Sequence, residues 1–182
     1  MIDVNAALQV AREVLPALAV LHDSRGVTHG AIGLERLVLS PQPRVTIVEH
    51  ALGGALAKLQ FPRTRLWREF RIAMPPSAGI PRFDARADVA NLALAVLALL
   101  AGRPLAGNDF PAGIQGLLDQ VVERLPNGTV RPLSSSLKTW FDLRLADTKE
   151  EAAKQTGDAK PAARDFLSVY DKAEERRAKN PD

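Results

Sequence analysis

The sequence predicts a mainly α-helical fold that contains one short β-hairpin. Apolar residues recur at helical spacing over residues 5–23, and a nearly unbroken apolar run covers residues 89–101. Between these two segments, the short apolar stretches 37–39 and 45–48 flank a Ser-Pro-Gln-Pro turn. With 46% hydrophobic and 25% charged residues, the composition is that of a globular protein.

The first predicted helix covers residues 5–23. It follows Asp3, a residue type that begins helices, and it ends before Gly26. Pro16 lies inside it and is expected to kink it. The two apolar stretches that come next are expected to pair as the hairpin.

Residues 52–83 contain Gly, Pro and Arg throughout, and we expect this segment to be irregular. The helix over residues 85–102 is apolar nearly all round, so it should be the central helix of the fold. Two more helices are predicted over residues 113–124 and 133–145. Ser134 is a typical N-cap residue for the second of them.

The composition changes after the last of these helices. We expect a folded unit over residues 1–145, a charged linker over residues 146–161 and a tail helix over residues 162–182. The tail helix would pack on its own domain, dock on a partner, or stay disordered; the sequence leaves all three open. Its apolar stripe consists of Phe166, Val169, Tyr170 and Ala173.

The bulk composition excludes some classes of site. The chain has 182 residues, enough for one domain with a tail, and no cysteine, so it forms neither disulfides nor thiolate metal sites. A net charge of +3 argues only weakly for nucleic acid.

The apolar run over residues 89–101 is too short to cross a bilayer, and we expect no leader-like segment at the start of the chain. We therefore expect a cytoplasmic protein without a membrane partner.

Residues 27–39 carry the most informative motif, Val-Thr-His-Gly-Ala-Ile-Gly-Leu-Glu-Arg-Leu-Val-Leu. This segment resembles the catalytic loop of eukaryotic-type protein kinases, H-R-D-L-K-P-x-N-I-L-L. The histidine is kept as His29. The catalytic aspartate of the family falls at Ala31, and its metal-binding asparagine falls at Arg36.

Other segments resemble kinase motifs in the same order along residues 1–145. They are residues 45–51 (the strand into D-F-G), 72–76 (A-P-E), 84–93 (the start of helix F), 99–104 (its end) and 130–132 (R-P-S). The resemblance implies a kinase-like large lobe without the small lobe, because no glycine-rich loop or paired lysine precedes the first helix.

The resemblance also implies structural roles for two residues. Asp88 should accept hydrogen bonds from the loop amides at His29 and Gly30, where buried donors need a partner; a plain helix N-cap is the alternative. Arg131 would pair in the family with the glutamate of A-P-E. Here that position is Pro76, so Arg131 needs another acid, a carbonyl or water.

The residues that perform phosphoryl transfer are replaced. Ala31 has no proton acceptor, Arg36 would repel Mg²⁺, and Glu49 stands where the family has the D-F-G aspartate. The resemblance therefore implies a pseudokinase rather than an enzyme, with no cofactor and no bound nucleotide. Such a module would act as a signalling scaffold, through a protein partner or as a homo-oligomer.

Two alternatives use the same region. A degenerate nucleotide-binding protein, or a kinase half completed by another chain, would use Glu49. A hydrolase or a metal site would use His29 and His50, the metal site together with Glu49. Packing of both histidines in the core is the simpler interpretation.

A basic run follows the hairpin. Its candidate binding residues are four arginines and one interleaved tryptophan: Arg63, Arg65, Trp67, Arg68 and Arg71. They could bind an acidic or phosphorylated peptide or nucleic acid. We expect no nucleic-acid partner, because no known nucleic-acid motif accompanies the run. The plainer interpretation is a solvated loop whose aromatic residues pack inward.

Overall fold

The computed structural model describes residues 2–25, 27–42, 44–74, 80–145, 162–168 and 172. It is mainly helical with two small antiparallel sheets, which confirms the predicted class and the hairpin after the first helix. The elements are α1 (Val4–Arg25), the 3-10 helix η1 (Leu34–Arg36), β1 (Leu37–Leu39), β2 (Val45–Ile47), α2 (Leu52–Leu59), α3 (Arg63–Phe70), α4 (Ala85–Ala101), α5 (Ile114–Gln120), β3 (Val122–Arg124), β4 (Val130–Pro132) and α6 (Ser135–Arg144).

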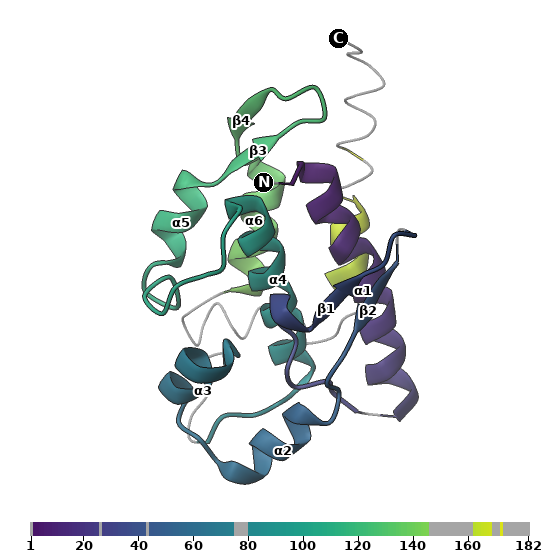
Figure 1. Cartoon of the computed structure of the whole chain (residues 1–182), viewed down its shortest axis with the longest axis vertical. Helices are drawn as coiled ribbons and strands as arrows, with labels where there is room; N and C mark the ends of the chain where they lie inside the picture. The colour runs from purple at the N-terminus through teal and green to yellow at the C-terminus, as the bar shows by residue number, and fades with distance from the viewer. Residues whose placement is uncertain are drawn as a thin grey trace.

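Helices α1 and α4 pack along each other at the centre of the fold (Figure 1). Nearly every residue of α4 is buried, as expected for a helix that is apolar all round. From α1, Leu15 and Leu18 are fully buried, and so are Leu92 and Leu97 of α4. Each such side chain contributes about 1.5–3 kcal/mol of hydrophobic stabilisation, so this pair of helices dominates the core.

Both ends of α4 are capped by local contacts. The Asp84 carboxylate accepts a hydrogen bond from the Ala87 amide at 2.9 Å. Gly102 closes the helix in the left-handed region, with φ +67°, which a glycine adopts without steric cost. Ser134 caps α6 in the same way, through the Leu137 amide.

Helix α1 has a property that the sequence analysis did not single out. Its residues Val4–Asp23 are long and apolar enough to cross a membrane by length and composition, unlike the shorter run that was considered there. Half of this segment is buried against the rest of the chain; a core helix of a soluble protein and a signal sequence near the N-terminus both meet the same criteria. The packing is therefore compatible with a soluble protein, and the cytoplasmic location stays a prediction.

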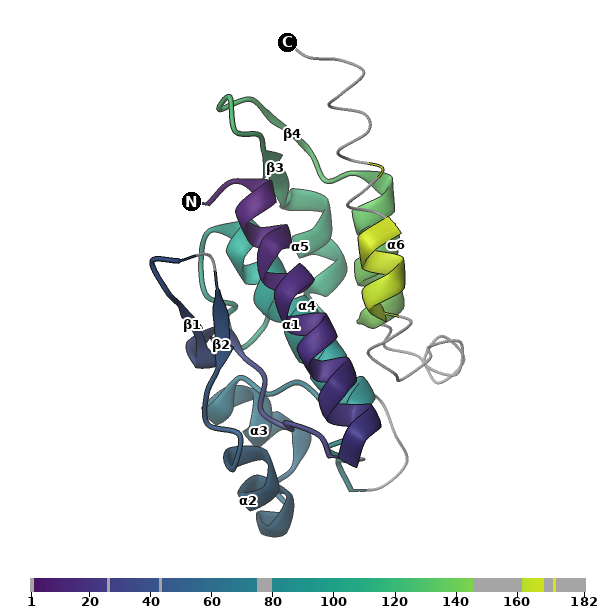
Figure 2. The same cartoon turned by 90° about the vertical axis from the view of Figure 1, so that its right-hand side faces the viewer.

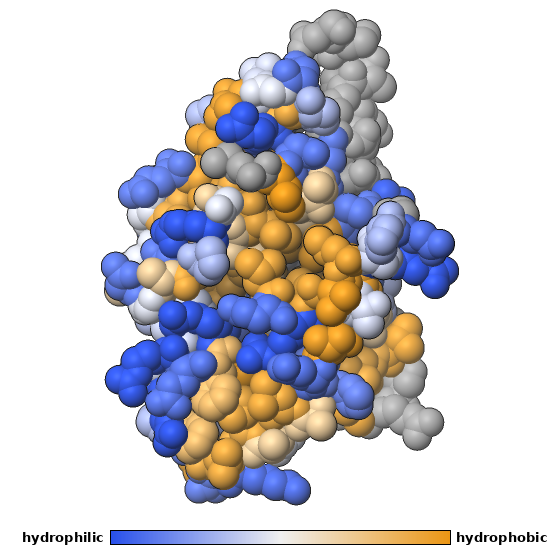
Figure 3. All heavy atoms as spheres, in the orientation of Figure 1, coloured by the Kyte–Doolittle hydropathy of each residue, from blue (hydrophilic) through white to orange (hydrophobic). Residues whose placement is uncertain are grey.

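The β1–β2 hairpin lies beside α1, and the Val45 amide donates a hydrogen bond to the Glu13 carboxylate at 2.9 Å. Its register pairs Leu37 with Ile47. Figure 3 shows apolar side chains gathered on this face of the molecule.

The prediction of an irregular segment over residues 52–83 was wrong, because it contains α2 and α3. These lie together at the lower end of Figure 1. Leu56 and Leu66 bury themselves in a second, smaller core with Ala31 and Ile72. Helices of eight residues are marginal alone and are stabilised by tertiary packing, so local signals did not reveal them.

The predicted helix over residues 113–124 was also wrong at its end. The helix stops at Gln120, and Val122–Arg124 forms β3, which pairs with β4. Glu123 is buried and accepts hydrogen bonds from Arg131 at 2.6 Å and from the Ser134 amide at 2.8 Å. Arg131 therefore has an acidic partner, one of the options that the sequence left open.

The described part of the tail is helical over residues 162–168 and lies against α6 (Figure 2). Phe166 is buried, with its ring centroid 5.2 Å from that of Trp140, and Asp165 forms an ion pair with Arg144. This part packs on its own domain. The linker, Val169, Tyr170 and Ala173 of the predicted stripe, and Pro75 and Pro76 lie outside the described residues.

Candidate functional site

The Asp88 carboxylate organises the loop between α1 and η1. It is fully buried at the start of α4 and accepts hydrogen bonds from the amides of His29 at 2.8 Å and Gly30 at 2.7 Å. These are the two contacts that the sequence analysis expected. The His22 ring donates to the same carboxylate through Nε2, at 3.0 Å. The plain N-cap role belongs to Asp84 instead.

His29 is held as a neutral ring. Its Nε2 is 3.1 Å from the Val48 carbonyl oxygen, which can only accept, and its Nδ1 is 3.3 Å from the Ala31 amide, which can only donate. The ring therefore carries its proton on Nε2. Burial lowers the pKa of His29 below its ordinary value, against the opposing effects of the Asp88 charge and the Val48 carbonyl.

Arg36 and Glu49 form an ion pair at the positions where the resemblance would put two metal ligands. The buried Arg36 donates from Nε to Glu49 Oε2 at 2.9 Å and from Nη1 to the Phe70 carbonyl oxygen at 3.2 Å. Glu49 adopts φ +63°, a conformation that costs a non-glycine residue about 1–3 kcal/mol. The guanidinium and the carboxylate neutralise each other. Ala31 is fully buried in the smaller core, with Leu56 and Leu66.

Two glycines allow α2 to lie directly on this loop, a contact that the sequence analysis missed. Gly30 has φ +72°, and a Cβ on Gly53 would lie 2.3 Å from the His29 carbonyl oxygen. Any larger residue at position 53 would push α2 away from the loop. The only available signal was the Gly-Gly pair at 53 and 54, which local rules assign to a turn.

The histidines do not form a metal-binding group in the described part of the chain. No group of three or more His, Asp or Glu side chains there is placed to hold a metal ion. Both ring nitrogens of His29 are occupied by backbone groups, and Glu49 is bound to Arg36. His29 packs in the core as predicted, but the prediction was wrong for His50, which is exposed.

The basic run forms α3 and its C-cap, and its side chains make different kinds of contact. Trp67 is buried and donates from Nε1 to the Gly107 carbonyl oxygen at 2.8 Å. Glu69 accepts from Arg65 at 2.9 Å and from Arg68 at 3.5 Å. Arg63 is half-buried, and Arg71 closes the helix. The run is therefore not one continuous cationic surface.

No protein-family model matches this sequence, and no curated protein matches it at a significant level. The kinase resemblance stays a prediction. A functional assignment therefore depends on the side chains of the site and on their contacts.

Replacing Asp88 by alanine should strongly destabilise the fold. The change leaves two buried amides without an acceptor, at about 1–3 kcal/mol each. Asp84→Ala is the matched control, because it removes a carboxylate from the same end of α4 and costs about 1 kcal/mol as a lost cap. Denaturant unfolding measures both, and equal losses would contradict the role given to Asp88.

The stability of the protein should fall as the pH drops from 7.5 to 5.5. The pKa of His29 is lower in the folded state, so the unfolded chain binds more protons below its own pKa of about 6.5. The contribution of His29 is complete above that pH and is lost as the pH falls toward the folded pKa.

Urea unfolding across this pH range tests the effect. His29→Gln should weaken the pH dependence, whereas the change His50→Gln at the exposed neighbouring histidine should leave it intact. An unchanged slope in His29→Gln would show that another group is responsible.

Proposed function

We propose that the chain is a catalytically inactive, pseudokinase-like module that works through protein–protein interaction, as a scaffold in signalling. The Arg36–Glu49 ion pair carries this proposal. At the two positions where the resemblance puts Mg²⁺ ligands, a guanidinium already neutralises the carboxylate and repels a divalent cation. Ala31 at the base position has no group to accept a proton from a substrate hydroxyl.

The contacts of Asp88 support the kinase-like part of the proposal. In that family, the aspartate at this position accepts hydrogen bonds from the amides of the catalytic loop, as Asp88 does from His29 and Gly30. The order of the elements also agrees with the resemblance: a long helix, a loop, a hairpin and then a buried central helix.

Strand β1 is the candidate interaction surface. Val38 is 50% exposed and Leu39 is 60% exposed. As neighbours in a strand they lie on opposite faces of the hairpin, so the free edge of β1, rather than one face, would form the contact. Figure 3 shows apolar side chains gathered on the side of the molecule that carries the hairpin. Contiguous apolar surface of this kind commonly marks a protein contact, and a second copy of the chain would bury it.

Addition of ATP and Mg²⁺ should leave the unfolding temperature unchanged. A ligand at about 100 times its dissociation constant would add roughly 2.7 kcal/mol of stability, a shift of a few degrees for a domain of this size. A thermal-shift titration gives the answer. A Mg²⁺-dependent rise that disappears in Glu49→Ala would contradict the proposal and favour the nucleotide-binding alternative.

The chain should self-associate through β1. Sedimentation of the wild type should give a dimer, and Val38→Asp combined with Leu39→Asp should give a monomer, because charges would have to be desolvated in the contact. Val130→Asp, an exposed valine on the other hairpin, is the matched control and should leave the dimer intact. A monomeric wild-type chain would rule out association through this edge.

A further inference from the structure

The tail helix over residues 162–168 presents one side to α6, against which it lies (Figure 2). Within this segment only Ala162 and Phe166 are buried. Ala162, Asp165 and Phe166 are three and four residues apart, so they share one side of the helix. This is the spacing with which an amphipathic helix docks on a partner surface.

Two positions of α6 receive the tail. Trp140 and Arg144 are four residues apart, so they also lie on one side of their helix. The rings of Trp140 and Phe166 meet edge to face, with centroids 5.2 Å apart and planes at 68°, an arrangement that aromatic pairs favour. Arg144 donates from Nη2 to the Asp165 carboxylate. An aromatic ring and a cation on α6 thus face an aromatic ring and an anion on the tail.

The ion pair does little to hold the tail in place. The Arg144 side chain is 4% exposed, and its Nε is buried without a hydrogen-bond partner among the described residues. Burial lowers the pKa of Arg144 below its ordinary value, and the Asp165 charge counteracts this only in part. Because Asp165 is about half exposed, its attraction offsets little of the cost of dehydrating the guanidinium.

Docking of the tail therefore depends mainly on one large apolar side chain, that of Phe166. Contacts with few buried side chains belong to the least stable parts of a fold and open locally. The tail is favoured over a separate helix because it belongs to the same chain, which raises its effective concentration at α6. A separate helix with the same three side chains could form the same contacts.

We propose that the Trp140–Arg144 surface of α6 is a docking site for an amphipathic helix of another protein, and that the tail closes this site in cis until such a helix displaces it. The partner helix carries an aromatic residue, an acidic residue directly before it and a small residue four positions before it. A second copy of the chain is the poorer occupant, because its tail already makes these contacts in cis. The site is on a different element from β1 and does not depend on the pseudokinase proposal.

A labelled peptide with the sequence of residues 160–172 is the probe for this site. Fluorescence anisotropy should show saturable binding to the full chain carrying Phe166→Ala, whose own tail has lost its apolar anchor. The wild-type chain should bind the peptide at least about tenfold more weakly, because its tail fills the site. No saturable binding to the variant, or equal binding to both chains, would overturn the proposal.

A competition experiment distinguishes a partner helix from a second copy of the chain. Unlabelled wild-type chain, added at the concentration of the peptide, should leave the peptide bound to the Phe166→Ala chain. If the wild-type chain displaced the peptide, a second copy would be the occupant and the proposal would fail.

A second variant opens the site without changing the core. Asp165→Lys puts a like charge beside Arg144, so this chain should also bind the peptide more tightly than the wild type does. Arg164→Gln is the matched control, because Arg164 is exposed on the same helix, and it should keep the site closed. Thermal unfolding checks that each variant is folded. A closed site in Asp165→Lys would contradict the role given to the charge pair.

Substituted peptides test which side chains are recognised. Peptides that carry Phe166→Ala or Asp165→Lys should each bind the opened chain about tenfold more weakly than the original peptide. If they bound equally well, the peptide would not be using the face that the tail uses, and the proposal would be wrong.

Discussion

The buried carboxylate of Asp88 is the interaction on which the site depends. A full charge in the core is tolerated only when donors surround it, and three donors converge here, from His22 of α1 and from the amides of His29 and Gly30. This fixes the loop against α4. The loop in turn provides the surface at Gly30 on which α2 packs. The position of α2 therefore depends on the hydrogen bonds that Asp88 accepts.

The Arg36–Glu49 ion pair is more exposed to solvent than the Asp88 carboxylate. The Glu49 side chain is 57% exposed and that of Arg36 only 10% exposed, so solvent screens much of the attraction and the pair adds little net stability. Its main effect is to keep the buried guanidinium from being unpaired, which would be costly. Glu49 adopts φ +63° where its carboxylate meets Arg36. The two charges therefore balance each other at these positions.

Sequence reasoning succeeded where the signal is local. The apolar character of α4 predicted that helix, and Ser134, a typical N-cap residue, marked the start of α6. It failed where stability comes from distant partners. Leu56 and Leu66 make α2 and α3 helical only by burial against other segments, and β3 was hidden because its central residue is an acid, Glu123, whose partner lies eight residues away. The same limit applies to Arg36, whose charge was recognised but whose pairing with Glu49 across 13 positions was not.

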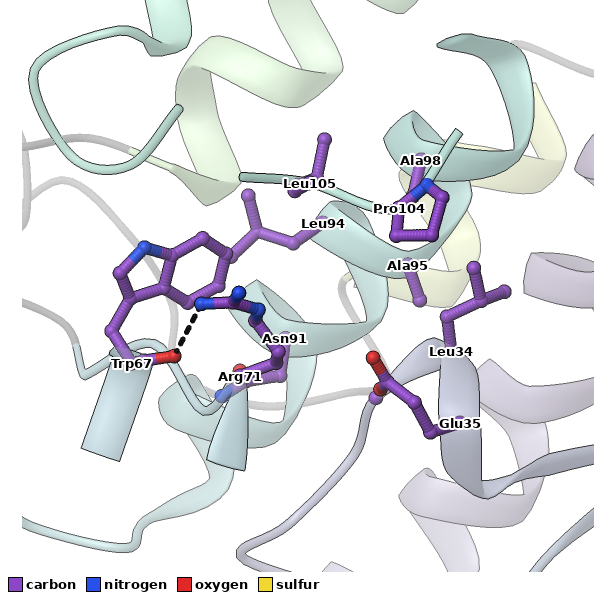
Figure 4. Close-up of a pocket in the computed structure, with 11 residues that line it drawn as sticks. Leu34, Glu35, Trp67, Arg71, Asn91, Leu94, Ala95, Ala98, Pro104 and Leu105 are labelled. Atoms are coloured by element: carbon purple, nitrogen blue, oxygen red, sulfur yellow. Dashed lines mark hydrogen bonds between the residues drawn. The ribbon is translucent and has the colours of Figure 1, made fainter. Parts of the chain in front are cut away.

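Element η1 carries the Arg36–Glu49 ion pair on one side and a small pocket, between η1, α3 and α4, on the other (Figure 4). Its successive side chains point in different directions because a 3-10 helix has about three residues per turn. Leu34 and Glu35 line the pocket, while Arg36 turns inward to Glu49. Gly33 is the point at which both arrangements depend on one residue. A Cβ there would lie 2.8 Å from a guanidinium nitrogen of Arg36 and 3.2 Å from a carboxylate oxygen of Glu35. A side chain at this position would displace both charges, so the bare glycine backbone allows the ion pair and the pocket to occupy adjacent faces of the same turn.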